Sequence, residues 1–559
     1  SPFFVKVHEF TETMLHQLFF QGSNSKSNWG KIKVNNIEIP VEIVLSTGHV
    51  SDGNSSLGIY TARYINEQKI TNDFRNPIAQ NQSGGLLFSE KGAFDRRDPN
   101  RPFKSISPFL LIPNRQEIVN SGRKLMDYLS NGHYISRTSG DKEFWGINSS
   151  LSHEKYNTSF KNPFEEEEGL FFTEDSLQDY EAKVNDIVRE WNVKNHRDAN
   201  NHVFAIIPGE DEYENNPYYY KLKKMLVEAG IPSTFITLNT LLKIEEKSIA
   251  FGPILESIWL NVYSKMGGKP WRLANQLGNV HCFIGIGFGI NKSDKENHIY
   301  AGIAHLFDNY GSWLDVASDS ANISEGDLDS FDGPDKYSQG TASFKISESV
   351  SKSILYNALK LYKEKQTKTN ENATNIVLHK LGQIFECEII GFLEGIRQVL
   401  GSLGSCRLGL LQIEQEHHVR LYDQLGDLNR QNHVVYKGST LKFNRSKNAL
   451  ATTGRINKSS YSGQITNYYG IGTPKPLILS SVIPSESILR RYGCNMEQFY
   501  DIDTLTDHAM ALTQLHWGSL KDTVRLPITA LYAQKVADLI SKTKMRVDPS
   551  LGFFRPWFL

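Results

Sequence analysis

The sequence predicts an α/β protein made of two successive units in which strands alternate with helices. The first unit contains apolar strand patterns at 107–113 and 202–208, with amphipathic helix patterns between and after them. The second contains apolar strand patterns at 281–290 and 375–379, with a long helix pattern at 347–363 between them. Because strands and helices alternate along the chain, we expect parallel strands with helices packed on the sheet faces.

The first unit shows the periodicities that distinguish helices from strands. After residue 113, Ile118, Leu125 and Leu129 recur on one helical face. A later helix ends at Gly230, a residue type that suits a helix C-cap. The predicted elements are strand 107–113, helices 114–131 and 175–191, strand 202–208, helix 218–230 and strand 235–238.

The second unit is longer and begins with a β–β–helix–β order. Its predicted elements are a helix ending at Lys265, strands 281–290 and 312–319, helix 347–363, strand 375–379, helix 384–400, a strand-rich region 407–485, and helices 503–516 and 527–542. The chain before residue 105 is predicted to be a small mixed β-rich segment. In it, residues 31–45 alternate as a strand pair, and 76–102 is interpreted as loop or linker. The predicted domains are therefore 1–104, 105–255 and 256–559.

Composition places the chain among ordinary globular proteins and excludes several function classes. Its 559 residues carry 61 basic and 62 acidic side chains, so any nucleic-acid contacts must be gathered into one region. The four cysteines form no CxxC pair, which argues against a zinc site and a disulfide framework and favours a cytoplasmic protein. The apolar runs are far shorter than the ~20 residues that span a bilayer.

Common catalytic and nucleotide-binding motifs are absent or incomplete. Gly285, Gly287 and Gly289 suggest a dinucleotide-binding loop, but Ile290 stands where GxGxxG needs its third glycine. No GxxxxGK[ST] motif occurs, and His417-His418 lack the HExxH pattern of metalloproteases. A dinucleotide-dependent enzyme and a zinc protease are therefore both disfavoured.

A different set of motifs has the chemistry of a phosphate anchor. Tyr219-x3-Lys223 is followed by 230–234 (GIPST) and by 262–268 (VYSKMGG), which contains Lys265. Two ammonium groups and a phenol hydroxyl match the acceptor oxygens of a terminal phosphate, and a tyrosine ring can stack on a base. Taken alone, the Tyr–Lys pair is explained equally well as an ordinary amphipathic helix start.

Further motifs follow in a fixed order along the chain. They are 265–271 (KMGGKPW), 283–287 (FIGIG), 376–382 (IVLHKLG), 470–476 (GIGTPKP), 512–515 (LTQL) and 526–533 (LPITALYA). Together with the phosphate-anchor motifs, this series resembles the MID and PIWI domains of the Argonaute family over about residues 105–559. The resemblance implies a Rossmann-like MID domain followed by an RNase H-like PIWI domain.

In the MID domains of this family, a Tyr, a Lys, a Gln and a second Lys hold the first phosphate of a guide strand. The resemblance places these roles on Tyr219, Lys223, Thr234 and Lys265, with Tyr218, Tyr220 and Lys224 as neighbouring alternatives in register. Threonine is shorter than glutamine, so a choice between a 5′-phosphate and a 5′-hydroxyl end stays open. RNA and DNA guides also stay open, because 2′-hydroxyl contacts cannot be identified from sequence.

The family's catalytic positions lack carboxylates in this chain. Cleavage by this fold uses two divalent metal ions held by carboxylates. The first aspartate position is Gly287, the second is Leu381, and the closing His or Asp position is Gln514. Glu348 or Glu325 is the candidate for the remaining glutamate. We therefore expect no catalytic residues and no target cleavage by this chain.

The apolar end of the chain has two interpretations. In many relatives the C-terminal carboxylate turns toward the guide phosphate, sometimes through a bound metal such as Mg²⁺, and the resemblance gives this role to Leu559. Alternatively, residues 553–559 form a hydrophobic tail that only stabilises the core.

The resemblance is greatest to short, catalytically inactive prokaryotic Argonautes. It implies a guide nucleic acid, a complementary target strand and an effector protein with an Argonaute-associated region, acting in defence against invading nucleic acid. Two alternatives remain: a nuclease with an unrecognised catalytic site, and a stand-alone binding protein that blocks invading nucleic acid.

Overall fold

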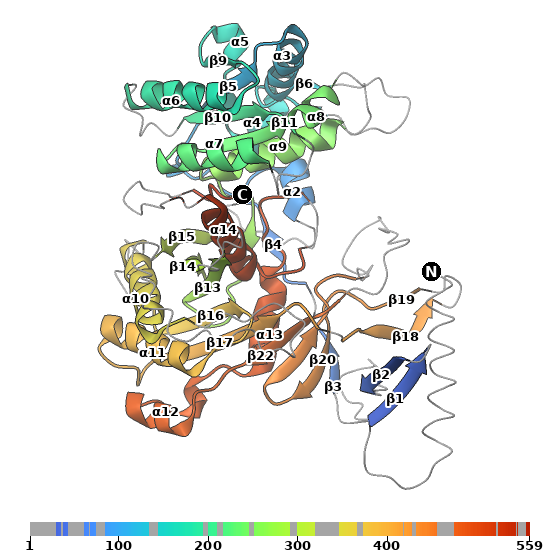
Figure 1. Cartoon of the computed structure of the whole chain (residues 1–559), viewed down its shortest axis with the longest axis vertical. Coiled ribbons are helices and arrows are strands. Elements are labelled where there is room, and N and C mark those ends of the chain that lie inside the picture. Colours follow the sequence, from blue (N-terminus) through green and yellow to red (C-terminus); the bar gives the residue numbers. More distant parts are fainter. Residues whose placement is uncertain are drawn as a thin grey trace.

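Two sheets with their covering helices form the body of the protein in the computed structural model (Figure 1). The residues it describes are 29–34, 37–42, 61–65, 67–73, 84–133, 144–193, 200–209, 216–244, 251–290, 299–318, 346–365, 373–417, 419–427, 432–454, 475–520, 524–543, 545 and 555–559. Within these ranges, no helix is both long and apolar enough to cross a membrane.

The first sheet is parallel and has β5 (Ser105–Pro113) at its centre. Its other strands are β10 (Asn201–Ile207), β11 (Ser233–Thr237), β8 (Ser159–Phe160) and β9 (Leu170–Thr173). The helices around it are α3 (Gln116–Asn131), α6 (Leu177–Val193), α7 (Pro217–Glu228), α8 (Leu238–Leu242) and α9 (Phe251–Lys265). Alternate residues of β5 contact opposite helix layers: Phe109 and Leu111 pack with α6 and α7, whereas Leu110 and Ile112 pack with α3 and α9.

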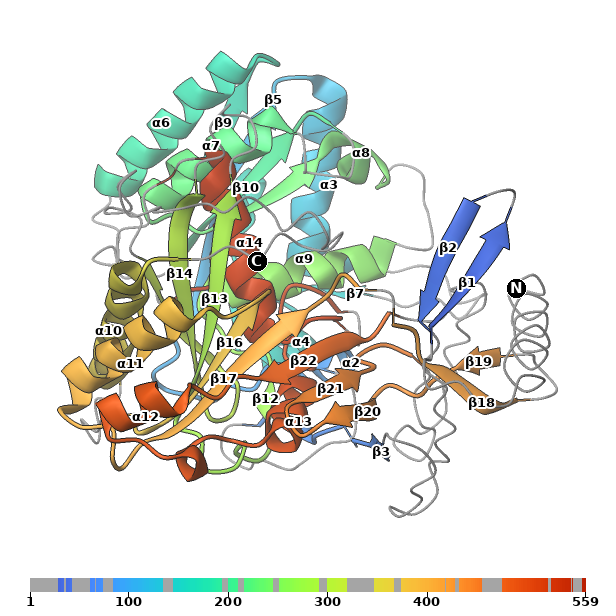
Figure 2. The same ribbon diagram turned by 60° about the horizontal axis from the view of Figure 1, so that its bottom comes forward.

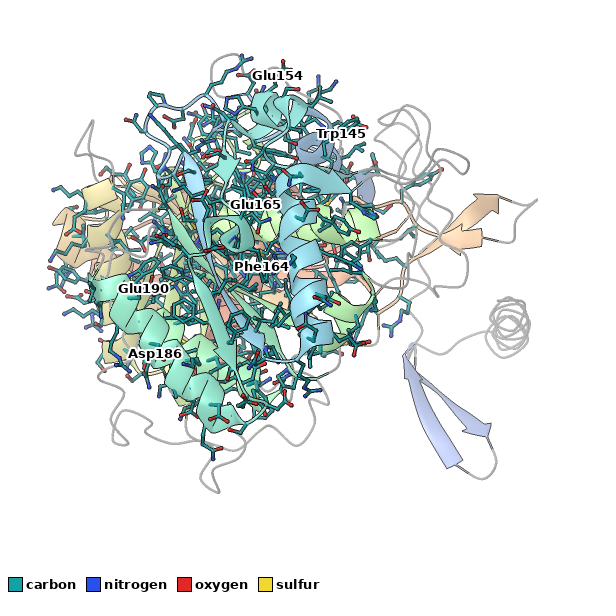
Figure 3. All side chains as sticks on the ribbon, turned by 90° about the horizontal axis from the view of Figure 1, so that it is seen from above. Trp145, Glu154, Phe164, Glu165, Asp186 and Glu190 are labelled. Atoms are coloured by element: carbon teal, nitrogen blue, oxygen red, sulfur yellow. The ribbon has the colours of Figure 1, made fainter. Side chains whose placement is uncertain are left out.

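Helix α6 shows why this sequence forms a helix on a sheet face. Tyr180, Val184 and Ile187 are buried at helical spacing. Asp186 and Glu190 lie along the outer side of α6 in the view from above (Figure 3). The apolar side packs on the sheet, which removes nonpolar surface from water.

The second sheet has nine strands in the order β15-β14-β13-β16-β17-β22-β21-β20-β3. β13 (Cys282–Ile290) is antiparallel to β14 (Ile299–Asp308) and parallel to β16 (Asn375–Leu381). The remaining strands are β15 (Trp313–Ser318), β17 (Arg407–Glu414), β22 (Leu477–Ser481), β21 (Lys447–Leu450), β20 (Ser439–Asn444) and β3 (Thr61–Tyr64). This order agrees with the predicted RNase H-like unit, although β14 was not predicted.

Helices cover both faces of the second sheet (Figure 2). On one face, α10 (Glu348–Lys365), α11 (Glu386–Leu400) and α12 (Glu486–Tyr492) share one buried apolar cluster with Ile284 and Ile286. On the other, α13 (Ile502–Leu512) and α14 (Ile528–Thr543) pack against Phe283 and Val377. The smaller elements are β6 (Gly132–His133), β7 (Phe144–Trp145), α4 (Ser150–Tyr156), α5 (Pro163–Glu166), β18 (Tyr422–Asp427), β19 (Asn432–Val434) and a 3-10 turn (Met496–Gln498).

The N-terminal segment forms one strand pair of its own and contributes two strands to the second unit. β1 (Trp29–Val34) and β2 (Ile37–Glu42) form the predicted antiparallel strand pair. β3 extends the nine-stranded sheet beside β20, and β4 (Ile70–Thr71) pairs with β12 (Arg272–Leu273). The pairing of β3 and β4 joins residues 61–71 to the second unit.

One helix, α2 (Gly84–Lys91), occupies a stretch that we predicted to be loop or linker. That prediction was wrong because the helix opens with two glycines, which weaken the helical signal. The glycines are required by close packing: a Cβ on Gly84 would lie 2.0 Å from Cε2 of Trp271, and one on Gly85 would lie 2.3 Å from the Leu520 carbonyl oxygen.

A buried polar network fixes the chain after α2 against α9. The Tyr263 hydroxyl donates to Asp95 Oδ1 at 2.6 Å, and the Lys269 backbone N–H donates to Asp95 Oδ2 at 2.9 Å. The Arg101 guanidinium donates to the Tyr156 carbonyl oxygen at 2.5 Å. Burial raises the pKa of Asp95 to about 6 despite these donors.

Candidate nucleic-acid interface

Helix α7 presents two of the predicted anchor residues one turn apart. Its start is set by Asn216, whose side chain accepts hydrogen bonds from the backbone N–H groups of Tyr218 and Tyr219, and by Pro217 in the first turn. Tyr219 and Lys223 then lie on the same face of the helix at i and i+4.

Tyr218, Tyr220 and Lys224 are the alternatives to the predicted anchor residues Tyr219 and Lys223, and each of them makes another contact. The Tyr218 hydroxyl donates to the Asp175 carbonyl oxygen at 2.7 Å, and the Lys542 ammonium donates to the Tyr220 hydroxyl at 2.9 Å. Lys224 lies 3.9 Å from Glu228. Tyr219 instead packs edge-on against Phe235 of β11, with ring centroids 5.1 Å apart.

Lys223 is almost completely buried, with 1% of its surface exposed. Its ammonium donates to the Trp557 carbonyl oxygen at 2.6 Å and to Ser233 Oγ at 3.4 Å. Burial lowers the pKa of Lys223 to about 7, since removal from water disfavours the charged form. The chain end and α7, 334 residues apart, are thus joined at this lysine.

Thr234, at the family's glutamine position, pairs with a histidine that sequence reasoning missed. Phe204 and Thr234 face each other in the parallel register of β10 and β11. His202 lies two residues before Phe204, and its Nε2 is 2.9 Å from Thr234 Oγ1. His202 is fully buried, and its Nδ1 has no hydrogen-bond partner among the described residues. The sequence signal for it was weak, because a histidine at a strand start is usually a satisfied core residue.

Lys265 ends helix α9 and is 5% exposed. Among the described residues, the charges that act on its ammonium are those of Lys223 and Lys535, and no acidic group is among them. Burial, together with the charges of Lys223 and Lys535, lowers the pKa of Lys265 well below its usual value. Lys535 of α14 is itself partly buried, which lowers its pKa.

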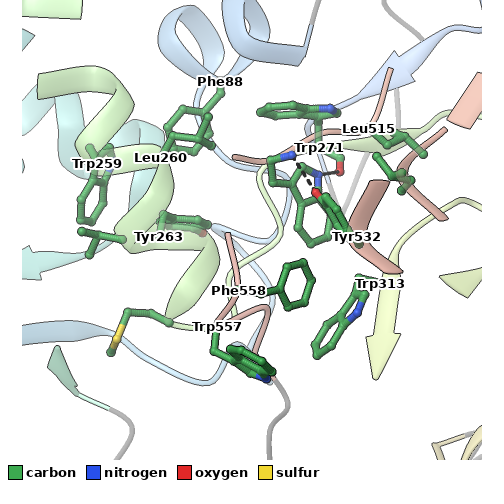
Figure 4. Close-up of a cluster of buried hydrophobic side chains, with 14 of the residues drawn as sticks. Phe88, Trp259, Leu260, Tyr263, Trp271, Trp313, Leu515, Tyr532, Trp557 and Phe558 are labelled. Atoms are coloured by element: carbon green, nitrogen blue, oxygen red, sulfur yellow. Dashed lines mark hydrogen bonds between the residues drawn. The ribbon is translucent and has the colours of Figure 1, made fainter. Parts of the chain in front are cut away.

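The last five residues, Arg555–Leu559, are folded against both units. Phe558 packs against His305 and Tyr532 with ring centroids 5.0 Å apart in each pair, and against Trp313 at 6.1 Å (Figure 4). Leu559 is partly exposed and approaches Gly518, where an added Cβ would lie 3.4 Å from Leu559 Cδ2.

We use the name basic cluster for Lys223, Lys265, Lys535, Arg555 and His202. Burial, together with the charges of Lys265, Lys223 and Arg555, lowers the pKa of His202 well below its usual value. Burial lowers the pKa of Arg555 to about 10. Across the described chain, no acidic side chain is among the charges that act on any member.

Such a cluster suits an anion and does not suit a magnesium ion. Mg²⁺ prefers carboxylate and other hard oxygen ligands, whereas the side chains gathered here are ammonium, guanidinium and imidazole groups. In the described ranges there is also no group of three or more His, Cys, Asp or Glu side chains placed to hold a metal. The basic cluster therefore supplies no side-chain ligand for the Mg²⁺ that the resemblance implied at the guide phosphate.

Two of the positions to which the resemblance assigns the missing catalytic carboxylates lie on adjacent strands. Ile286 of β13 faces Lys380 of β16 in parallel register, so the next residues, Gly287 and Leu381, are neighbours at the same sheet edge. An added Cβ at Gly287 would lie 2.3 Å from the carbonyl oxygen of Ala533 in α14. Helix α14 therefore occupies the space that a side chain at position 287 would need.

Gln514, at the third of these positions, forms side-chain hydrogen bonds with the backbone of Gln68. Its Oε1 accepts from the Gln68 N–H at 3.0 Å, and its Nε2 donates to the Gln68 carbonyl oxygen at 3.1 Å. Glu348 is exposed at the start of α10, and Glu325 lies outside the described residues.

Comparisons with known proteins agree with this architecture. The family model "Piwi domain" matches residues 203–544, more than half of the chain. The structure of Clostridium butyricum Argonaute bound to a guide DNA and a 19-mer target DNA is similar, with a TM-score of 0.58 and 21% identity over 89% of this chain and 55% of that one. Aa-Ago with externally bound siRNA has a TM-score of 0.49 and 15% identity over 86% of this chain and 53% of that one.

This chain thus spans about half the length of the two solved structures. No curated protein matches it. The extent of the domain match, with the RNase H-like strand order, settles the family: the chain is a member of the Argonaute–PIWI family.

Proposed function

We propose that this protein binds the 5′ end of a guide strand in the basic cluster and uses the guide to recognise a complementary strand. The observation that carries the proposal is a set of buried cations without acidic partners in the described chain, beside the Tyr219 ring. A strand end brings phosphate charge and a base to stack, and these match ammonium groups and an aromatic ring.

Binding of short oligonucleotides tests this proposal directly. We expect 5′-phosphorylated strands to bind more tightly than 5′-hydroxyl strands of the same sequence, and Lys265→Met to reduce that difference. Lys224→Met is the matched control, because Lys224 lies on α7 outside the basic cluster beside Glu228. Equal affinity for the two strand ends, with no effect of Lys265→Met, would refute the anchor. Sequencing of co-purified nucleic acid shows whether the guide is RNA or DNA.

We propose further that the protein does not cut its target. Support comes from Gly287, where α14 backbone fills the side-chain space, from apolar Leu381, and from Gln514, which is engaged with Gln68. Two-metal cleavage needs carboxylates at such positions. Guide-loaded protein incubated with a labelled complementary strand and Mg²⁺ or Mn²⁺ should leave it intact. Scission opposite the guide would support the nuclease alternative.

A recognition protein that does not cleave its target can act through a partner. We therefore propose an associated effector protein that acts when guide and target pair, in defence against invading nucleic acid. Affinity purification of the chain from its native cells should recover a stoichiometric partner. Recovery of the chain with nucleic acid alone would favour the stand-alone blocking function.

A further inference from the structure

The basic cluster is assembled from five separate segments. Lys223 comes from α7, His202 from β10, Lys265 from α9, Lys535 from α14 and Arg555 from the chain end. Two of the three lysines are at most 5% exposed. Buried cations in proteins are normally paired with carboxylates, and this cluster has no such pairing in the described chain.

Among the described residues, no acidic group acts on either of the two most buried lysines. Lys223 is contacted by the Ser233 hydroxyl, the Trp557 carbonyl oxygen and, at 5.9 Å, the Phe235 ring. Lys265 lies within electrostatic range of Lys223 and Lys535.

The other members of the basic cluster also have no acidic side chain among the described charges that act on them. The charges of Lys265, Lys223 and Arg555 act on His202. Burial, together with the charge of Lys535, lowers the pKa of His516 to about 3. No acidic side chain of the described residues is thus among the charges that act on the cluster.

Desolvation and mutual repulsion both favour loss of protons from such a cluster. At neutral pH, Lys223, with a pKa of about 7, is only partly protonated, and Lys265 and His202 have pKa values shifted in the same direction. A phosphate dianion that enters the cluster favours protonation of the lysines again, because each ammonium then gains a nearby opposite charge.

We propose that capture of a phosphorylated strand end is coupled to proton uptake by Lys223 and Lys265. This inference rests on the proposed guide anchor and adds a linkage to it. Each neutral lysine takes one proton from solvent as the dianion arrives, and no bond of the strand is broken. Affinity for the phosphorylated end must then fall as the pH rises above neutrality.

Isothermal titration calorimetry on the full chain measures the linkage. The titrant is a 5′-phosphorylated oligonucleotide at pH 8, in buffers that differ in ionisation enthalpy. A phosphate monoester has a second pKa of about 6, so at pH 8 the strand is already dianionic and exchanges no protons itself. We expect uptake of roughly one to two protons per strand, since a lysine with a pKa near 7 is about 10% protonated at this pH. The matching 5′-hydroxyl strand should give none.

Arginine substitutions separate charge from titration, because a guanidinium stays protonated at pH 8. Lys265→Arg should lower the proton uptake by about one while the preference for the 5′-phosphate persists. Lys224→Arg should leave the uptake unchanged.

Failure of the proton linkage and failure of the guide anchor give different results. Tight, phosphate-dependent binding by the unaltered protein without proton uptake at pH 8 would overturn the linkage and leave the anchor standing. Absence of any phosphate-dependent binding would overturn the anchor itself.

Discussion

Restoring a carboxylate at position 287 provides a strong test of how α14 is packed. In the Gly287→Asp protein, the new Cβ would lie 2.3 Å from the carbonyl oxygen and 2.5 Å from the carbonyl carbon of Ala533. Both atoms belong to helix backbone, which cannot move away as a flexible side chain can. We therefore expect α14 to shift or the protein to unfold more readily.

The expected loss of stability in Gly287→Asp is the sum of two contributions. Overpacking of a dense core costs about 1–3 kcal/mol. A carboxylate without a partner adds about 1–3 kcal/mol or more for a polar group buried without hydrogen bonds. Gly287→Asp should therefore destabilise the fold by at least about 2 kcal/mol, and Gly287→Ala, which has only the steric contribution, by about 1–3 kcal/mol.

Urea unfolding, followed by circular dichroism, measures these differences. Gly404→Ala is the matched control: its added Cβ would meet only Ser402 Oγ at 3.6 Å, so its effect should stay within about 0.5 kcal/mol. Because α14 also carries Lys535, Gly287→Asp should weaken binding of phosphorylated strands and still show no cleavage. Unchanged stability of Gly287→Asp, or target cleavage by it, would refute the reasoning.

Three further changes test other parts of the structure. Lys223→Met should weaken binding of a 5′-phosphorylated strand by about 10- to 100-fold, since a charged hydrogen bond contributes about 1.5–3 kcal/mol. The control Lys224→Met should bind this strand with nearly the affinity of the unaltered protein. Phe558→Ala should lower stability by about 3–5 kcal/mol in urea unfolding, because it empties a buried aromatic contact. Asp95→Asn should flatten the stability–pH curve between about pH 4 and 6. Asp95 has a folded pKa raised to about 6, so the folded protein binds its proton more tightly, and this stabilisation is lost as the pH rises through 6.

Each of these expectations has a contrary outcome. Equal binding by Lys223→Met and Lys224→Met would show that Lys223 does not contact the strand end. A Phe558→Ala protein as stable as the original would mean that the tail does not support the core. An unaltered pH profile in Asp95→Asn would assign the dependence to other groups.

Local patterns were enough to predict much of the secondary structure. The alternation of strands and helices, the hairpin of β1 and β2, and helices α10, α11 and α14 all followed from periodicity. Periodicity reports which face of an element is apolar, and that property is written in neighbouring residues. Helix α2 and strand β14 were missed, because glycine and alanine weaken the apolar signal in both segments.

The sequence alone determined that positions 287, 381 and 514 carry no carboxylate and that Tyr219, Lys223 and Lys265 are available as an anchor. Only the tertiary structure joined His202, Lys535 and Arg555 to these lysines, placed the backbone of α14 against Gly287, and attached β3 to the far end of the nine-stranded sheet. The physical reason is that residue type is local, whereas burial and the presence or absence of a counter-charge depend on which distant segments pack together.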